Sequence, residues 1–159
     1  MNTLYVIRHA IAQPRGPEVA EADRALTDKG LARLREALAG MKALGVAPER
    51  VLHSPWLRAA QTAERVAKVL GGSLDVTETL LHSPAAPLLA AMGEGAVAVV
   101  GHEPWLGELM AWLVTGEAER GGQFPLKKAG LAWLEGPFKP GGMTLRALLP
   151  AKALRLAGA

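Results

Sequence analysis

The sequence predicts an α/β fold built on a mostly parallel β-sheet with helices on both faces. Three short β-prone runs occupy residues 4–7, 50–54 and 96–100. Apolar residues between and after these runs recur every three to four positions, which is the spacing of amphipathic helices. The runs are rich in apolar residues, as strands are when helices cover both sides of their sheet. The alternation of strands and helices favours parallel pairing.

Two helices follow the first and second runs. Thr27 is predicted to cap the first helix, and Ser54 followed by Pro55 predicts the N-cap and the first position of the second. The pair Gly71-Gly72 is predicted to end the second helix. The apolar residues expected to form the buried stripe of the first helix are Leu31, Leu34, Leu38, Met41 and Leu44.

Shorter elements complete the predicted fold. The third run passes through residues 101–104 into a helix that we expect to end near Val114. No internal repeat or low-complexity segment interrupts the chain. The remaining predicted elements are a short strand at 74–76, a short helix at 84–92 and two late strands at 131–134 and 143–149.

Length and composition are typical of one globular domain. The chain has 159 residues, 50% of them hydrophobic, which is enough for a sizeable core. It has no cysteine, so disulfides, thiol catalysis and cysteine-ligated metal sites are excluded. The run at 4–7 is too short for the apolar region of a signal peptide, and no apolar span of about 18 residues exists. We therefore expect a soluble, cytoplasmic protein with no membrane partner.

The charge of the chain is weakly positive and unevenly distributed. The formal net charge is +3, and the chain lacks Lys/Arg runs and interleaved aromatic and basic residues, so nucleic acid is not an expected partner. Residues 121–159 contain six Lys or Arg and one Glu, a formal charge of +5, whereas residues 1–120 sum to −2. This basic part is either a solvated face or a rim that attracts acidic substrates.

Basic side chains follow all three main strands. Arg8 and His9 follow the first, Arg58 lies in the turn after the second, and His102 follows the third. The carboxyl ends of parallel strands line one crevice, so we expect these four side chains to converge on an anion site. Arginine binds phosphate oxygens in a planar, bidentate manner. A lone histidine at a strand end is usually structural, which is our interpretation of His53, but the co-occurrence of the four residues favours function for His9 and His102.

The residues around these side chains resemble the histidine phosphatase superfamily, also called phosphoglycerate mutase-like. The similar segments are Arg8-His9, residues 54–62 (SPWLRAAQT), Gly101-His102 and residues 26–30 (LTDKG). The resemblance implies one domain over residues 1–159, with a three-layer α/β/α fold, a mixed, mostly parallel six-stranded sheet, and no metal or organic cofactor. It also implies that His9 attacks phosphorus, that the resulting phosphohistidine is hydrolysed, and that Arg8, Arg58 and His102 bind the equatorial phosphate oxygens.

The length of one connection distinguishes branches of this superfamily. Longer members carry an insertion that caps the pocket, whereas only nineteen residues separate Val76 from Ala96 here, which suggests an open site. In length and motifs the chain most resembles the bacterial SixA-type phosphohistidine phosphatases. We therefore expect a phosphatase that acts on a phosphorylated protein with a phosphohistidine domain. A small phosphorylated metabolite as substrate, and a non-catalytic module that binds phosphoproteins or anions, remain alternatives.

Other enzyme classes lack their defining patterns in this chain. The glycine-rich motifs of P-loop nucleotidases and dinucleotide-binding oxidoreductases are absent, as is the Gly-x-Ser-x-Gly of α/β-hydrolases. The four histidines are scattered and include no close pair, so the sequence predicts no zinc site.

A proton donor for the leaving group is not evident. Glu78 follows the short strand, where acid-bearing relatives place a donor, and Glu103 directly follows His102. Each is either a general acid or a solvated or helix-capping residue. A nitrogen leaving group departs more readily than an alkoxide, so phosphohistidine would tolerate the lack of a donor.

Several positions depart from the family pattern. Ala10 stands where many relatives have glycine, and Ala12 and Arg15 stand where mutases carry polar Ser and Asn, which argues against mutase activity. Arg15 either meets a second anionic group or is a solvated loop residue. Lys127 and Lys128 precede a late strand, and one of them is a candidate for the border of the site.

Overall fold

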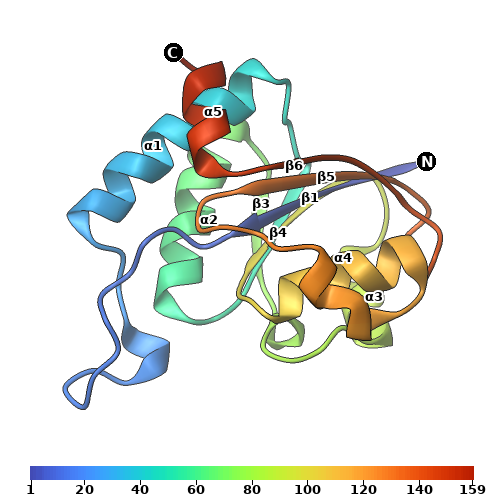
Figure 1. Cartoon of the computed structure of the whole chain (residues 1–159), viewed down its shortest axis with the longest axis horizontal. Helices are drawn as coiled ribbons and strands as arrows, with labels where there is room; N and C mark the ends of the chain where they lie inside the picture. Colours follow the sequence, from blue (N-terminus) through green and yellow to red (C-terminus); the bar gives the residue numbers. More distant parts are fainter.

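Six strands form one sheet in the order β3-β2-β4-β1-β5-β6 in the computed structural model, which describes all 159 residues. The β1–β4, β2–β4 and β2–β3 pairs are parallel, and β5 is antiparallel to both β1 and β6 (Figure 1). The mixed, mostly parallel sheet that we predicted is confirmed. The strands are β1 (Asn2–Arg8), β2 (Arg50–His53), β3 (Ser73–Val76), β4 (Ala96–Gly101), β5 (Leu131–Gly136) and β6 (Thr144–Leu149).

Helices cover both faces of this sheet, giving three layers (Figure 1). Helices α1, α2 and α5 pack on one face together with Tyr5 and Ile7 of β1. Helices α3 and α4 pack on the other face together with Leu4 and Val6. The helices are α1 (Asp28–Ala43), α2 (Leu57–Leu70), α3 (Ala86–Met92), α4 (Trp105–Thr115) and α5 (Ala151–Ala157), with short 3-10 helices η1 (Glu21–Asp23), η2 (Glu78–Leu80) and η3 (Ala118–Gln123).

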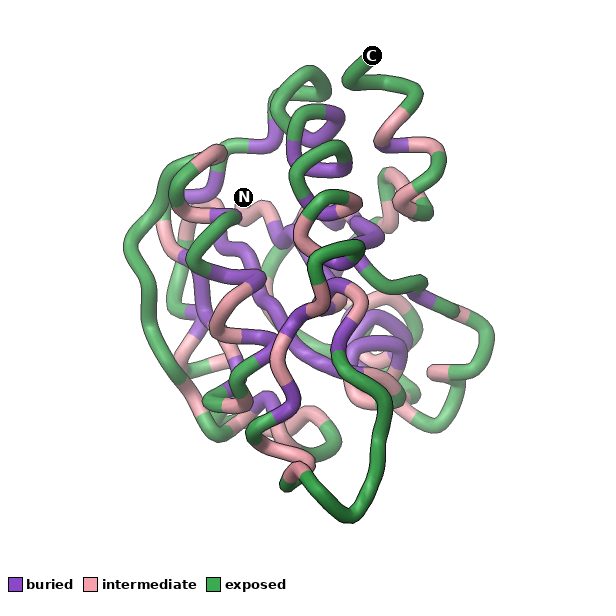
Figure 2. Tube along the Cα trace, turned by 90° about the vertical axis from the view of Figure 1, so that its left-hand side faces the viewer, coloured by how far each residue is buried: buried purple, intermediate pink, exposed green.

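The central strands form the core. Successive side chains of a strand point to opposite faces, so a strand covered on both sides must be apolar at every position. Residues Leu4 to Ile7 and Val97 to Val100 are buried, whereas the edge strand β3 is exposed along its length. Figure 2 shows the buried residues along the inner strands and on the inner turns of the helices. No helix combines the length and apolar character that crossing a membrane would require.

Some predicted element boundaries are wrong for physical reasons. Helix α2 begins at Leu57 after Trp56, so Ser54 is not its N-cap. The Ser54 hydroxyl instead contacts His102 and accepts a hydrogen bond from the Trp56 N–H. Leu44, predicted to be buried, is 42% exposed because α1 ends at Ala43. Helix α3 begins two residues later than predicted, and α5 was not predicted.

Strand register brings distant parts of the chain to one edge of the sheet. Arg8, the last residue of β1, lies opposite Gly101 of β4, and His53 of β2 lies opposite Val100. The residues that follow these strands, His9 and His102 among them, are therefore neighbours at the carboxyl edge.

The loop that leaves β1 is fixed by close backbone packing on α1. Thr27 caps α1 as predicted, because its hydroxyl accepts a hydrogen bond from the Gly30 N–H at 2.9 Å. The Thr27 N–H donates to the Ile11 carbonyl at 3.0 Å. A Cβ at Gly30 would lie 2.1 Å from that carbonyl oxygen, so only glycine permits this approach.

The substitution Gly30→Ala tests this packing. We expect it to lower the free energy of unfolding by about 2–4 kcal/mol, since backbone must move to relieve the clash. The matched control is Gly122→Ala, where a Cβ would meet no atom within 4 Å. Urea unfolding of both variants is the measurement, and equal stability of the two would contradict the proposed contact.

Candidate active site

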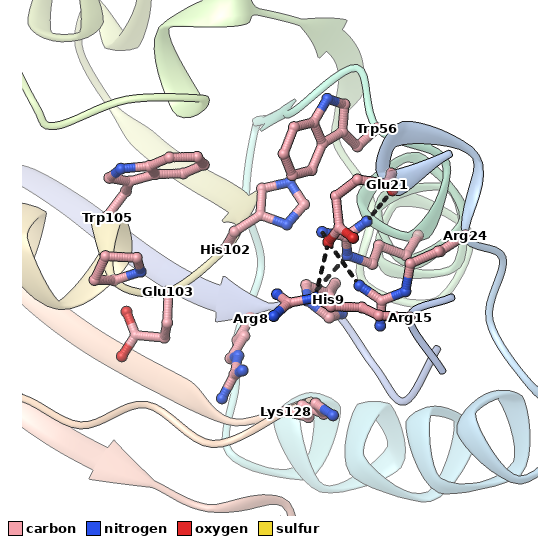
Figure 3. A pocket seen from close by; sticks show the side chains of 12 residues that line it. Arg8, His9, Arg15, Glu21, Arg24, Trp56, His102, Glu103, Trp105 and Lys128 are labelled. Carbon is pink, nitrogen blue, oxygen red and sulfur yellow. Dashed lines mark hydrogen bonds and ion pairs between the residues drawn. The ribbon is translucent and has the colours of Figure 1, made fainter. Parts of the chain in front are cut away.

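A pocket of about 860 Å³ opens at the carboxyl edge of the sheet (Figure 3). All four side chains that the strand ends predicted, Arg8, His9, Arg58 and His102, line this pocket. The structure therefore brings them together as expected. The other lining residues are Arg15, Glu21, Arg24, Trp56, Glu103, Pro104, Trp105 and Lys128.

The hydrogen bonds of His9 indicate which of its two ring nitrogens carries the proton. His9 is 5% exposed, and its Nδ1 lies 2.7 Å from the carbonyl oxygen of Ala10. A carbonyl can only accept, so Nδ1 carries the proton of the neutral ring. The Nε2 atom then has an unprotonated lone pair, consistent with the long hydrogen bond of 3.4 Å that it accepts from the Arg58 Nε. This is the tautomer that a nucleophilic imidazole requires.

Burial and positive neighbours keep both pocket histidines neutral. Desolvation lowers the pKa of His9 to about 4, against the opposing hydrogen bond to Ala10, and the charges of Arg58, Arg8 and Lys128 lower it further. Desolvation is also the main cause that lowers the pKa of His102 to about 3, followed by the electrostatic effects of His9 and the arginines. Both imidazoles are thus uncharged at neutral pH.

His102 lies against His9 and offers an unused nitrogen. The two ring centroids are 5.2 Å apart. The Nε2 of His102 lies 2.7 Å from the Ser54 hydroxyl, which accepts from the Trp56 N–H and can donate its own proton to Nε2. In that arrangement the Nδ1 of His102 carries the proton. This nitrogen is buried without a partner, so a ligand oxygen would satisfy it.

Arg8 supplies a further buried donor that has no partner, in addition to the Nδ1 of His102. Its Nη1 donates to the Leu126 carbonyl at 3.1 Å, which fixes the guanidinium, while its Nε is buried without a partner. Desolvation lowers the pKa of Arg8, and the charge of Glu103 opposes that effect. Buried donors are nearly always paired in folded proteins, so this one also indicates a place for an acceptor.

The arginine side of the pocket already holds one carboxylate, from Glu21. Its Oε1 accepts from Arg24 Nη1 at 2.7 Å, from Arg58 Nη2 at 2.9 Å and from Arg15 Nε at 3.3 Å (Figure 3). Arg58 also donates to the backbone carbonyl of Glu21 at 2.6 Å. Although desolvation opposes it, these arginines lower the pKa of Glu21 below its ordinary value. The Glu21 carboxylate therefore occupies this wall of the pocket.

Sequence reasoning missed Glu21 and Arg24. Both lie between β1 and α1, Glu21 in the single turn η1 and Arg24 directly after it, and this segment has no periodicity that predicts where a side chain points. Only the surplus of charged residues in this segment was a signal. Arg15, for which a second anionic group was one interpretation, meets the Glu21 carboxylate.

The structure separates the two acid candidates. Glu103 lines the pocket, but its two carboxylate oxygens accept from the backbone N–H groups of Gly107 and Leu126, at 2.7 and 3.2 Å. Glu78 is exposed on η2 and is not among the residues that line the pocket.

The remaining candidates are also placed. Lys128 lines the pocket, whereas Lys127 lies outside it. The Nδ1 of His53 contacts the Ser54 carbonyl, and neither His53 nor the fourth histidine of the chain, His82, lines the pocket. No three His, Cys, Asp or Glu side chains gather closely enough to hold a metal ion.

Comparison with known proteins places this arrangement in a family. The family model described as histidine phosphatase superfamily (branch 1) matches residues 4–82. An uncharacterized protein of Picosynechococcus sp. (strain ATCC 27264 / PCC 7002 / PR-6) is 36% identical over 141 residues, which are 82% of this chain and 83% of that protein.

Solved structures agree with this match. The protein histidine phosphatase SixA complexed with tungstate has a TM-score of 0.78 and 29% identity, over 96% of this chain and 99% of that one. The alpha-ribazole phosphatase from Shigella flexneri has a TM-score of 0.70 at 18% identity, over 94% of this chain and 96% of that one, and so shares the fold. The chain belongs to the histidine phosphatase superfamily.

Proposed function

We propose that this chain is a phosphohistidine phosphatase that works through a phosphorylated His9. The observation that supports it most strongly is the unprotonated Nε2 of His9 in a pocket lined by arginines. The unpaired donors of Arg8 and His102 supply further sites for phosphate oxygens. We also propose that residues 1–159 form one histidine phosphatase domain, because SixA aligns with 96% of the chain.

The first chemical step transfers the phosphoryl group to His9. Arg58 Nε gives up its hydrogen bond to His9 Nε2 and donates to one equatorial oxygen, while the unpaired donors of Arg8 and His102 bind the other two. The freed lone pair of Nε2 forms a bond to phosphorus as the bond to the leaving group breaks. Charge in this transition state is spread over those oxygens, so fixed donors stabilise it without reorganising. The imidazole of the substrate leaves with the bonding electron pair and takes a proton from water.

The second step returns the enzyme to its starting state. A water molecule attacks phosphorus on the face opposite the Nε2–P bond, and its proton passes to solvent as that bond breaks. Nε2 recovers its lone pair and inorganic phosphate leaves. The low pKa of His9, about 4, makes the neutral ring the favoured product.

The lack of a free acid favours a nitrogen leaving group. Glu103 is engaged by two backbone N–H groups, and Glu78 lies outside the pocket. General acids accelerate the departure of poor leaving groups by about 10²–10⁴-fold. A pocket without one suits phosphohistidine, the substrate class named by the SixA neighbour. A small phosphomonoester is the second candidate, and the position of Glu103 in the pocket is the observation that favours it.

The substitution His9→Ala tests the nucleophile. We expect turnover of a phosphohistidine peptide to fall by at least about 10⁴-fold, because no other side chain replaces the attacking lone pair. The matched control is His53→Ala, which removes another strand-end histidine with the same Nδ1–carbonyl contact but outside the pocket. Steady-state rates of the two variants are compared, and a His9→Ala rate within tenfold of wild type would refute the proposal.

The pH dependence of His9 follows from its burial. A base with a lowered pKa keeps its neutral form down to that lower value, so His9 remains neutral until the pH falls to about 4 rather than 6.5. Long-range ¹⁵N NMR of the imidazole at pH 5.5 should therefore show a neutral ring with its proton on Nδ1. Because Lys128 contributes to the lowering, Lys128→Ala should raise this pKa. A midpoint near 6.5 in the wild type would contradict the desolvated site.

Leaving-group preference tests the choice of substrate. We expect kcat/KM for a phosphohistidine peptide to exceed that for an alkyl phosphate by at least about 10²-fold, the contribution that a general acid would have made. We also expect Glu103→Gln to change both values by a similar factor, since its role is to hold backbone. A selective loss of alkyl phosphate turnover in this variant would identify Glu103 as a general acid and favour the small phosphomonoester.

A further inference from the structure

A second depression lies directly beside the active-site pocket. Its volume is about 570 Å³, and it shares Arg8 and Lys128 with the pocket. Its lining contains no Asp or Glu. We call it the basic groove, and its lining residues are Arg8, Ile11, Lys29, Arg33, Lys127, Lys128, Ala129, Ala151 and Arg155.

Four separate parts of the fold supply these cations. They are the end of β1, the first turns of α1, the turn at 127–128 and helix α5. They meet because β5 pairs with β1 and because α5 packs on α1. The uneven charge of the sequence, +5 over residues 121–159, is thus partly concentrated at one place beside the active site.

Most of this positive charge has no internal partner. The ion pairs in the groove are those of Glu36 with Arg33 and Arg155, at 3.9 and 3.5 Å. Lys29, Lys127 and Lys128 are exposed and have no acidic partner within 4.0 Å. Partial desolvation, and after it the positive charges of Arg8 and of the pocket arginines, lowers the pKa of Lys128. Like charges that converge without a counter-ion are a binding feature for an anion.

We propose that the basic groove binds acidic side chains that flank the phosphorylated histidine on a partner protein. This inference rests on the proposed function. The four side chains that we propose to hold the phosphoryl group, Arg8, His9, Arg58 and His102, are buried or half-buried. The groove instead has exposed lysines beside apolar Ile11, Ala129 and Ala151. Flexible, separated lysines suit several carboxylates spread over a protein surface better than one compact phosphate.

The groove lies where such a partner would reach it. Arg8 and Lys128 line both cavities, so a phosphohistidine in the pocket places its neighbouring residues at the groove. Complementary charge there raises the rate of association and selects among partners, and salt weakens both effects.

The test uses two phosphohistidine peptides of equal length, one with Glu and Asp on both sides of the phosphohistidine and one with Ser and Gly. At low salt we expect wild-type kcat/KM to be about tenfold higher for the acidic peptide, and the preference to shrink at high salt. The double variant Lys29→Glu/Lys127→Glu should lose it. The control, Lys42→Glu/Lys139→Glu, makes the same charge change at the opposite edge of the sheet and should keep it.

A small substrate distinguishes an effect of the basic groove from an effect of the active-site pocket. p-Nitrophenyl phosphate reaches only the pocket, so both double variants should hydrolyse it within about threefold of wild type. An equal loss for this compound and the acidic peptide in the Lys29→Glu/Lys127→Glu variant would overturn the proposal, because the groove would then only support catalysis. The proposal would also be overturned if the Lys29→Glu/Lys127→Glu variant lost activity toward a small bisphosphate but kept its preference for the acidic peptide, because the groove would then bind a second phosphate group.

Binding distinguishes failure of the groove from failure of the proposed function. A fluorescent acidic peptide without phosphate should bind wild type and the control variant, and bind the groove variant at least about tenfold more weakly. If neither phosphopeptide is hydrolysed but this binding pattern holds, the proposed substrate is wrong and the groove remains an acidic-segment site. Equal binding by all three proteins would overturn the groove proposal.

Discussion

Two imidazoles, His9 and His102, lie buried at the ends of adjacent parallel strands with arginines around them. Desolvation and positive surroundings both disfavour a charged imidazole, so the rings stay neutral and the lone pair of His9 remains available. The strand register and the backbone contacts of the site maintain this arrangement of the two rings. The strand register places the rings together, and the backbone carbonyl of Ala10 fixes the tautomer of His9.

Concentrating arginines at one sheet edge requires a compensating negative charge. Arg58 is 2% exposed, and a buried cation is stable only when it is paired. Glu21 supplies that charge from the irregular segment after β1, and its carboxylate contacts Arg58, Arg24 and Arg15. The same geometry explains why this wall can accept an oxyanion group. Arg8 and His102, by contrast, keep buried nitrogen atoms unpaired, and we propose that the phosphoryl group lies on that side of the pocket.

Sequence reasoning predicted the strands and helices whose apolar residues recur with a regular spacing. Apolar continuity predicted the buried strands, and their parallel order predicted that Arg8, His9, Arg58 and His102 meet. It failed where local rules compete with tertiary contacts. Ser54-Pro55 has the pattern of a helix start, yet the Ser54 hydroxyl pairs with His102 and the helix begins later. The roles of Glu21 and Lys127 depend on a loop path and on the packing of α5, and neither leaves a periodic signal.

The central claim is that the neutral Nε2 of His9 attacks phosphorus. The most direct test is to mix the enzyme with a ³²P-labelled phosphohistidine peptide, quench within milliseconds in alkali and map the labelled residue by mass spectrometry. The account predicts an alkali-stable, acid-labile phosphoryl group on His9, formed and lost at rates that match turnover. Label on another residue, or turnover with no phosphorylated enzyme at any time, would contradict it.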